Sequence, residues 1–365
     1  MYKNLAAWRA FAPALAALFF SPINHAQQPV TPPVKAAFVY VAPLTAAGWV
    51  RQHEIGRLAV QATLGDKVQT TYVENVPEGA DAERVIRDLA QQGNQIIFTP
   101  SFGYMEPTLK VAREFPNVKF ESITGYKAAP NVATANARYY EGRYLAGVAA
   151  GRMATQAGYV AGFPIPEVIQ GINAFTLGMR SVNPKATVKV VFLGEWFNPP
   201  RERDAAMTLM NQGVEVLAFH TGSTAVMVAA QERGRLAVAY HSDMRSVAPD
   251  AQVVAVTHRW DDYYTRRVQA VLDGSWRSEQ VWGGVGAGFI RVEGFGRKVP
   301  EAVQKEVNAR QADMAAGRLP VFAAKGKAVR DNTGKVVIAP GQALTDAQIL
   351  EMNWLVDGVQ GKLSR

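Results

Sequence analysis

The residues of this sequence best suited to chemistry are aromatic and polar ones that come directly after short apolar stretches. They are Trp49, Phe102, Gly103, Tyr104, Phe163, Glu167, Trp196, Asn198, His220, Thr221 and Asp243. Tryptophan rings stack well on a flat, electron-rich ligand. Buried carboxylates such as Glu167 and Asp243 can accept hydrogen bonds from ring or exocyclic N–H groups, which discriminates strongly between ligands. The pattern predicts a binding pocket for a flat small molecule.

Each of these residues also has a purely structural interpretation. Trp49 could simply pack its own loop, Trp196 could belong to the core, and Asp243 could cap a helix. The pattern alone leaves both interpretations open.

No catalytic or metal-binding motif accompanies these residues. Gly284, Gly286 and Gly288 resemble part of a dinucleotide fingerprint, but no first strand-to-helix turn surrounds them. The five histidines do not fall at metal-ligand spacing, although His220 and His241 each end a predicted strand and could meet in a cleft. The absence of cysteine excludes disulfides and thiolate chemistry. We therefore predict a binding protein without a cofactor or a metal, not an enzyme.

These residues depend on strands and helices that alternate from residue 35 onward. Residues 36–41 form an apolar run typical of a buried parallel strand, and a helix pattern begins at Trp49 after a short loop. The same alternation predicts further strands at 67–73, 96–98, 119–123, 158–163, 187–193, 214–219, 236–240, 252–257 and 281–290. Since ligands of open α/β sheets bind beyond the carboxyl ends of the strands, the loops that follow should open on one cleft.

The alternation runs through two rounds, before and after a long helix predicted at 138–154. It indicates an α/β fold with two similar lobes, each built on a doubly wound parallel sheet. After residue 300 the pattern is less regular. It predicts a helix at 300–316, a β-hairpin at 329–338 and a last helix at 345–356 that Thr345 caps.

Length and composition fit an exported, folded protein. The 365 residues are enough for two domains, and 48% hydrophobic with 19% charged residues is typical of a folded chain. Residues 1–26 have the basic start and apolar run of a secretory signal peptide, and 27–34 read as a flexible lead-in. With no cysteine for a lipid anchor, we expect a free periplasmic protein. The net charge of +8 is scattered, and no nucleic-acid motif appears.

Several longer stretches together resemble one known family. They include 48–56, 74–84, 99–107, 137–147, 163–168, 171–175, 181–184, 242–244, 273–276, 282–284 and 352–358. In these stretches the chain resembles the basic membrane protein family of substrate-binding proteins of ABC transporters, whose best-known members bind purine nucleosides. The resemblance covers residues 35–361, and it looks closest to a proteobacterial branch.

The resemblance implies the type I periplasmic binding fold, with two Rossmann-like lobes joined by three crossovers near 125, 258 and 284. Lobe 1 would then comprise 35–125 and 259–283. Lobe 2 would comprise 126–258 and 284–365, including the C-terminal hairpin and helix. A purine ligand, an ABC permease partner and a monomeric state are expected on the same grounds.

The resemblance also implies roles for three residues. Trp49 would stack on the base, Trp196 would cover its other face, and Asp243 would make a polar contact. Residues 44–47 and Gly222 stand where related chains often carry acidic side chains. Fewer carboxylates leave fewer partners for ribose hydroxyls, so we favour a nucleobase such as adenine. A purine nucleoside receptor, a ligand-binding sensor and, less favoured, a nucleoside hydrolase-type enzyme stay open as alternatives.

Overall fold

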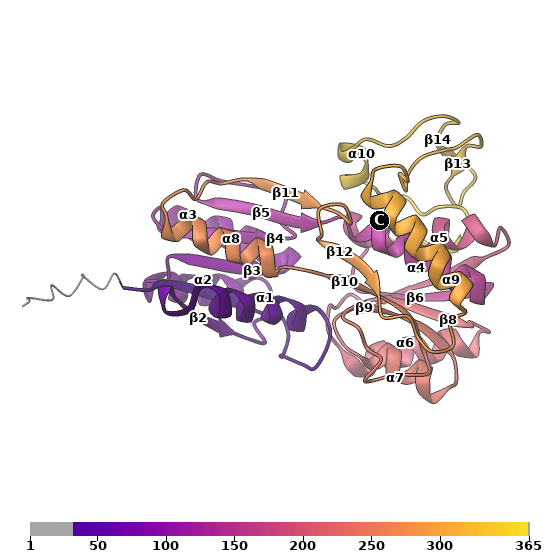
Figure 1. The fold of residues 1–365 in the computed structure, drawn as a ribbon, viewed down its shortest axis with the longest axis horizontal. Helices are drawn as coiled ribbons and strands as arrows, with labels where there is room; N and C mark the ends of the chain where they lie inside the picture. The colour runs from indigo at the N-terminus through magenta and orange to yellow at the C-terminus, as the bar shows by residue number, and fades with distance from the viewer. Residues whose placement is uncertain (1–31, 364–365) are drawn as a thin grey trace, which may run out of the picture. The chain divides into compact units, whose positions relative to one another are not determined.

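The computed structural model describes residues 32–363. The predicted signal peptide, and all but the last residues of the predicted lead-in, lie outside this part of the chain. From Pro33 onward the chain is organised around two large sheets with helices packed on each (Figure 1). No helix within 32–363 is long and apolar enough to cross a membrane.

The first sheet pairs all its strands in parallel. In spatial order they are β11 (Gln280–Gly283), β5 (Val132–Ala137), β4 (Lys119–Ile123), β3 (Ile96–Pro100), β1 (Val34–Val39) and β2 (Val68–Val73). The helices of this lobe are α1 (Trp49–Leu64), α2 (Ala80–Gln91), α3 (Met105–Glu114) and α8 (Asp261–Leu272). The chain reverses its direction across the sheet between β1 and β3, which is where open α/β sheets bind ligands.

Strand β1 shows why its sequence lacks a polar face. Ala36 and Phe38 belong to the core that includes α1 and α8, whereas Ala37 and Val39 belong to the core that includes α2 and α3. Side chains alternate across a strand, so a sheet covered on both faces requires apolar residues at every position. This confirms the predicted doubly wound arrangement.

The second sheet is parallel except for one strand. In spatial order it contains β12 (Ile290–Glu293), β10 (Gln252–His258), β9 (Leu236–His241), β8 (Val216–His220), β6 (Gln156–Ala161), β7 (Thr187–Phe192) and β15 (Val359–Gln360). Strand β12 runs antiparallel to β10. The helices of this lobe are α4 (Tyr139–Met153), α5 (Pro166–Val182), α6 (Pro199–Asn211), α7 (Ala225–Glu232) and α9 (Glu301–Ala315).

Helices α4 and α5 approach closely because glycines stand at their contact. A Cβ atom on Gly147 would lie 2.1 Å from the carbonyl oxygen of Phe175, and one on Gly178 would lie 2.0 Å from that of Tyr144. Any larger side chain would push the helices apart. Helix α4 carries Arg143 and helix α5 carries Glu167, so this contact sets how the two charged residues lie relative to each other.

The chain passes between the sheets three times, after Ala137, after His258 and after Gly283. The predicted first crossover near residue 125 is therefore wrong, because residues 132–137 form β5 beside β4 in the first sheet. This strand is rich in alanine and has no helix before it, so it lacks the usual strand signal. The predicted strand at 281–290 is also two strands, β11 and β12, in different sheets.

The C-terminal region contains the predicted hairpin, formed by β13 (Val329–Arg330) and β14 (Val336–Ile338). The last helix, α10 (Asp346–Leu350), starts with a capping box at Thr345 but is shorter than predicted. Beyond it, Asn173 of α5 accepts a hydrogen bond from the Val356 backbone and donates one to the Trp354 carbonyl. These tertiary contacts hold the segment extended, so it cannot continue the helix.

Candidate binding site

A pocket of about 560 Å³, counted with the solvent space at its mouth, is lined by loops of both lobes. The first lobe contributes residues 41–43, Trp49, Val50, Ser101, Phe102 and Thr124. The second lobe contributes Glu167, Trp196, Phe197, residues 220–222 and His241. Most of these residues lie at or just after the carboxyl ends of strands, which is the position that the fold predicts for a ligand.

Trp49 is an aromatic side chain that the first lobe contributes to the pocket lining. Its Nε1 atom donates a 2.8 Å hydrogen bond to the carbonyl oxygen of Pro100 at the end of β3. Its ring packs against the imidazoles of His53, His241 and His258, with centroids 4.3, 5.3 and 5.0 Å away. The ring is half-buried, and these contacts fix its orientation.

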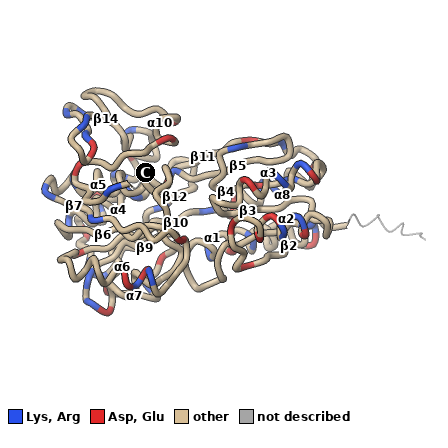
Figure 2. Tube along the Cα trace, turned by 180° about the vertical axis from the view of Figure 1, so that it is seen from behind, with Lys and Arg blue, Asp and Glu red and all other residues tan. Residues whose placement is uncertain are grey.

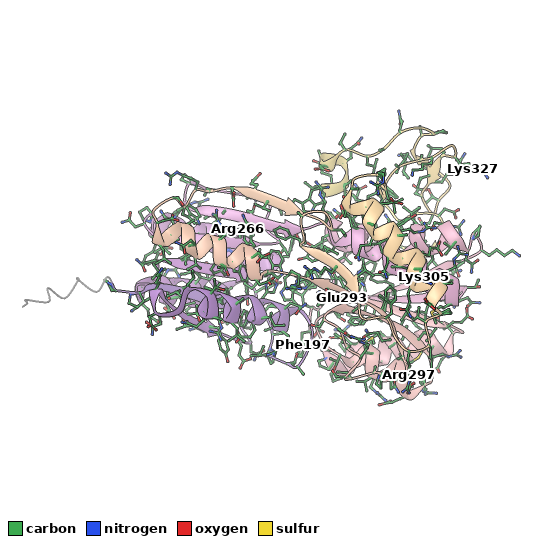
Figure 3. All side chains as sticks on the ribbon, viewed as in Figure 1. Phe197, Arg266, Glu293, Arg297, Lys305 and Lys327 are labelled. Atoms are coloured by element: carbon green, nitrogen blue, oxygen red, sulfur yellow. The ribbon has the colours of Figure 1, made fainter. Side chains whose placement is uncertain are left out.

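Trp196 and Phe197 bring aromatic surface from the loop between β7 and α6. The Trp196 ring packs edge-on against Phe163, with centroids 4.8 Å apart. A Cβ atom at Gly162 would lie 2.7 Å from that ring, so the glycine leaves room for it. Phe197 lies beside Trp196 in the lining and is labelled in Figure 3. The pocket thus has a tryptophan from each lobe.

Glu167 is the carboxylate of the pocket lining, and it stands in the first turn of α5. Its Oε2 atom accepts a 3.0 Å hydrogen bond from the Asn136 amide of β5 in the other lobe. Its Oε1 atom lies 3.5 Å from Nε2 of His220. This geometry leaves acceptor capacity on Oε1 for an N–H group in the pocket.

Four buried histidines form a cluster in which His53, His241 and His258 contact Trp49, and His220 contacts His241. The Trp260 indole donates a hydrogen bond to Nδ1 of His258, so the proton of that neutral ring is on Nε2, 3.0 Å from Nδ1 of His241. Burial lowers the pKa of His53, His220 and His241, and it lowers the pKa of His258 to about 3. The cluster is therefore uncharged at neutral pH. No group of acidic or histidine side chains within 32–363 is arranged to hold a metal ion.

The two lobes also contact each other directly at the edge of the pocket. The backbone N–H of Gly48 donates a 3.0 Å hydrogen bond to Oγ of Ser242. Gly48 has φ +106°, and a Cβ atom there would lie 2.2 Å from the carbonyl oxygen of Gly222. Glycine is therefore required at this contact.

Comparison with known proteins identifies the family. The family model of PnrA-like substrate-binding proteins of ABC transporters matches residues 33–318. The chain belongs to this family. A purine-binding protein of Brucella abortus is 45% identical over 332 residues, which are 90% of this chain and 94% of that protein. A candidate ABC transporter glucose-binding protein of Haloferax volcanii is 34% identical over 332 residues, covering 90% of this chain and 81% of that protein.

Solved structures of ABC transporter solute-binding proteins share the fold. One from Aeropyrum pernix superposes with a TM-score of 0.69 at 18% identity, over 82% of this chain and 93% of that one. One from Conexibacter woesei gives a TM-score of 0.62 at 21% identity, over 78% and 97% of the two chains. The predicted family and the predicted two-lobed fold are thus confirmed.

Six of the predicted site residues of this substrate-binding protein line the pocket. They are Trp49, Phe102, Glu167, Trp196, His220 and Thr221. His220 and His241 do meet there, with ring centroids 6.1 Å apart. Their role in binding stays a prediction.

Four other predicted residues lie behind the lining, where they support it. The Gly103 backbone donates a hydrogen bond to Glu78, and the buried Tyr104 hydroxyl donates one to the Val76 carbonyl. Asn198 caps α6 through a hydrogen bond from the Arg201 backbone. Phe163 supports Trp196 through the edge-on contact described above.

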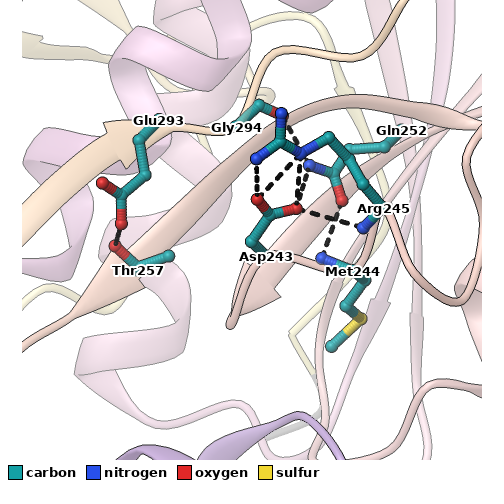
Figure 4. Close-up of polar contacts among 7 residues, drawn as sticks. All are labelled: Asp243, Met244, Arg245, Gln252, Thr257, Glu293 and Gly294. Atoms are coloured by element: carbon teal, nitrogen blue, oxygen red, sulfur yellow. Dashed lines mark hydrogen bonds and ion pairs between the residues drawn. The ribbon is translucent and has the colours of Figure 1, made fainter.

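Asp243 is not part of the pocket lining. Its carboxylate forms an ion pair with Arg245 and accepts a 2.8 Å hydrogen bond from the Gln252 amide, close to Gly294 (Figure 4). Asp243 does not cap a helix either, because no helix stands between β9 and β10; its carboxylate is held by Arg245 and Gln252. At this strand end the pocket is lined by His241 instead.

Thr124 and Phe197 are lining residues that the sequence analysis did not select. Thr124 follows β4 directly and has φ +69°, which is unusual for a β-branched residue and often marks a functional loop. The rule that residues after strands line the cleft selects Thr124 as well. Phe197 stands next to Trp196, so a search for aromatic pairs after strands selects it too.

Proposed function

We propose that this substrate-binding protein holds a purine nucleobase, adenine or a close relative, between its lobes and delivers it to an ABC permease. The observation that carries the proposal is that Trp49, Trp196 and Glu167 line the same pocket. Two indoles suit the faces of a flat base, and a carboxylate suits its N–H edge. The 45% identical purine-binding protein of Brucella abortus supports the same ligand class.

The state of the pocket hydroxyls favours a base over a nucleoside. Ser101 already donates a hydrogen bond to Glu78, and Thr221 already donates one to Glu202. The protons of these two hydroxyls are therefore not available to ribose oxygens. In the described lining Glu167 is the carboxylate that remains to accept a hydrogen bond from a ligand, and a ribose carries several hydroxyls that need polar partners. The contact between Gly48 and Gly222 also takes up space at the edge of the pocket.

A sugar is the competing ligand, because the Haloferax volcanii relative is a candidate glucose-binding protein. The mostly apolar and aromatic lining argues against it, since a bound sugar leaves few hydroxyls without a hydrogen-bond partner. We place the protein in the periplasm because residues 1–26 have the pattern of a signal peptide. No reaction is expected of it, because the matching family consists of substrate-binding proteins of ABC transporters.

Mass spectrometry of the small molecule released on denaturing the purified protein tests the proposal directly. Calorimetric titration with adenine, hypoxanthine, adenosine and glucose then ranks the candidates. Tightest binding of a free base is the expected result. Tighter binding of adenosine would favour the nucleoside alternative, and binding of glucose alone would overturn the purine assignment. Recovery of unchanged adenosine after incubation excludes a hydrolase.

A further inference from the structure

Arg143 is a buried cation directly behind the pocket. Its side chain on α4 has no exposed surface, and its guanidinium carbon lies 3.2 Å from the centroid of the Tyr240 ring. One nitrogen donates a hydrogen bond to the Phe219 carbonyl, whereas Nε and Nη1 have no hydrogen-bond partner among the described residues. A buried charge usually has an ionic partner, so this arrangement needs an explanation.

Arg143 packs near Nδ1 of His220 and is not part of the pocket lining. A Cβ atom placed on Gly171 would be 3.6 Å from Cγ of Arg143 and 3.8 Å from Nδ1 of His220, so both side chains border the same small space. Nδ1 of His220 is buried and has no partner, while Nε2 lies 3.5 Å from Oε1 of Glu167. The imidazole thus separates a cation behind it from a carboxylate in the pocket.

We propose that Arg143 is a positioning residue for the purine site: it keeps His220 uncharged, with its proton on Nε2, so that Glu167 meets a neutral N–H there and keeps its negative charge for an N–H group of the ligand. This inference rests on the proposed function. It assigns a role to a residue outside the pocket lining.

Electrostatics explains how Arg143 would act on His220. Burial is the main factor that lowers the pKa of His220, and the nearby Arg143 cation adds to it, because a cation near Nδ1 favours a bare nitrogen there and opposes a second proton. The charged or titratable groups around this imidazole are Glu167, Arg143, Tyr139, Tyr159, Tyr240, His241 and His258. Within this set Glu167 alone favours the imidazolium, and without Arg143 it could form an ion pair with His220. That ion pair would neutralise the carboxylate charge that the ligand needs.

The first test is the tautomer of His220 in the wild-type protein without ligand. Long-range proton–nitrogen NMR spectra of histidine-labelled protein report the charge and the tautomer of each ring, and His220→Gln assigns the signal. The expected result at about pH 7 is a neutral ring with its proton on Nε2. An imidazolium, or a proton on Nδ1, would overturn the proposal whether or not any variant folds.

The second test removes the cation. In Arg143→Met the titration midpoint of His220 should rise, and in Arg143→Lys, which keeps a charge, it should stay closer to wild type. Arg152→Met is the matched control, because Arg152 lies on the same helix but pairs with Glu306 near the surface. An unchanged His220 midpoint in a folded Arg143→Met protein would contradict the proposal.

Adenine affinity measured across the same pH range links the effect to binding. Each pH unit below a midpoint lowers the neutral fraction of a group about tenfold. Arg143→Met should therefore lose adenine affinity at mildly acidic pH, at roughly that rate per pH unit, where wild type and Arg152→Met lose little. If His220 behaves as expected but wild type binds no purine, the proposed function fails while the effect on the imidazole stands. If adenine binds but its pH profile is the same in wild type and Arg143→Met, the positioning role fails alone.

Discussion

Arg267 and Arg143 are buried arginines, one in each lobe, with opposite surroundings. Arg267 of α8 donates hydrogen bonds of 2.6 Å to Glu121, 2.9 Å to Glu279 and 2.8 Å to the Arg277 carbonyl. Within residues 32–363, Arg143 of α4 donates to one backbone carbonyl, and its Nε and Nη1 atoms have no partner. The first arginine holds its lobe together, whereas the second leaves donors unused beside the pocket.

The same contrast extends to other polar groups. Glu121 is completely buried and receives hydrogen bonds from Tyr263 and Trp276 as well as from Arg267. By comparison, buried polar atoms without a partner gather mainly around the pocket and the histidine cluster: His53 Nε2, Tyr139 Oη, Arg143 Nε and Nη1, Tyr159 Oη, Trp196 Nε1, His220 Nδ1 and Tyr240 Oη. Because unsatisfied buried groups are costly, their concentration at one place indicates a site shaped for function.

The largest effect on stability should come from breaking the hydrogen-bond network around Glu121. Arg267→Met leaves the Glu121 carboxylate buried without its cation, which should lower the free energy of unfolding by about 3–5 kcal/mol. Chemical denaturation measures this loss. Adenine affinity of the folded fraction should not change, because no residue of this network lines the pocket. A loss below about 1 kcal/mol would mean that the network contributes no more than a surface pair.

The next largest effect is expected in the pocket, as a loss of adenine affinity when Trp49 is changed. Trp49→Ala should weaken adenine binding by about 1–3 kcal/mol, the usual contribution of an aromatic side chain stacked on a base. Trp49→Phe should keep much of the affinity. Trp276→Phe is the control in the other network: it removes the hydrogen bond to Glu121, so stability should fall while affinity stays the same. An unchanged dissociation constant for Trp49→Ala would remove Trp49 from the binding site.

Sequence reasoning found much of the pocket because strand periodicity fixes one edge of a sheet. Trp49, Glu167 and Trp196 all follow apolar runs at the carboxyl ends of strands, and the sheet brings these ends together. The sequence did not indicate the position of Arg143 behind the pocket, because this residue lies within a helix. Its surroundings depend on which strand ends pack against that helix. Both the residue pattern and the resemblance selected Asp243, and only the fold shows that Arg245 and Gln252 occupy its oxygens.

Each of the four buried histidines should make a smaller contribution, seen as a pH dependence of the free energy of unfolding. Burial lowers the pKa of His53, His220, His241 and His258 in the folded protein, so below about pH 6.5 the unfolded chain binds protons that the folded chain does not. Stability should therefore fall with acidity, from about pH 6.5 downward, by up to about 1.4 kcal/mol per pH unit for each histidine.

Denaturation at several pH values between about 8 and 5 measures this slope. Glu121 and Glu141, whose pKa burial raises, act in the opposite direction and reduce it. His53→Gln should make the slope shallower, because it removes one of the four buried rings. Equal slopes in the two proteins would contradict the assignment of His53 as a buried neutral histidine.

The smallest effect is expected at Asp243, and it separates the contact implied by the resemblance from the observed one. Asp243→Asn removes the charge that pairs with Arg245 but keeps a group that can bond Gln252 (Figure 4). Because Asp243 lies outside the lining, adenine affinity should stay within about twofold of wild type, and stability should fall by no more than about 1 kcal/mol. Glu167→Gln, tested beside it, should weaken adenine binding by about 1.5–3 kcal/mol, because a charged acceptor of the pocket is lost. If Asp243→Asn weakened binding as much as Glu167→Gln does, Arg245 would have to release the Asp243 carboxylate when ligand binds.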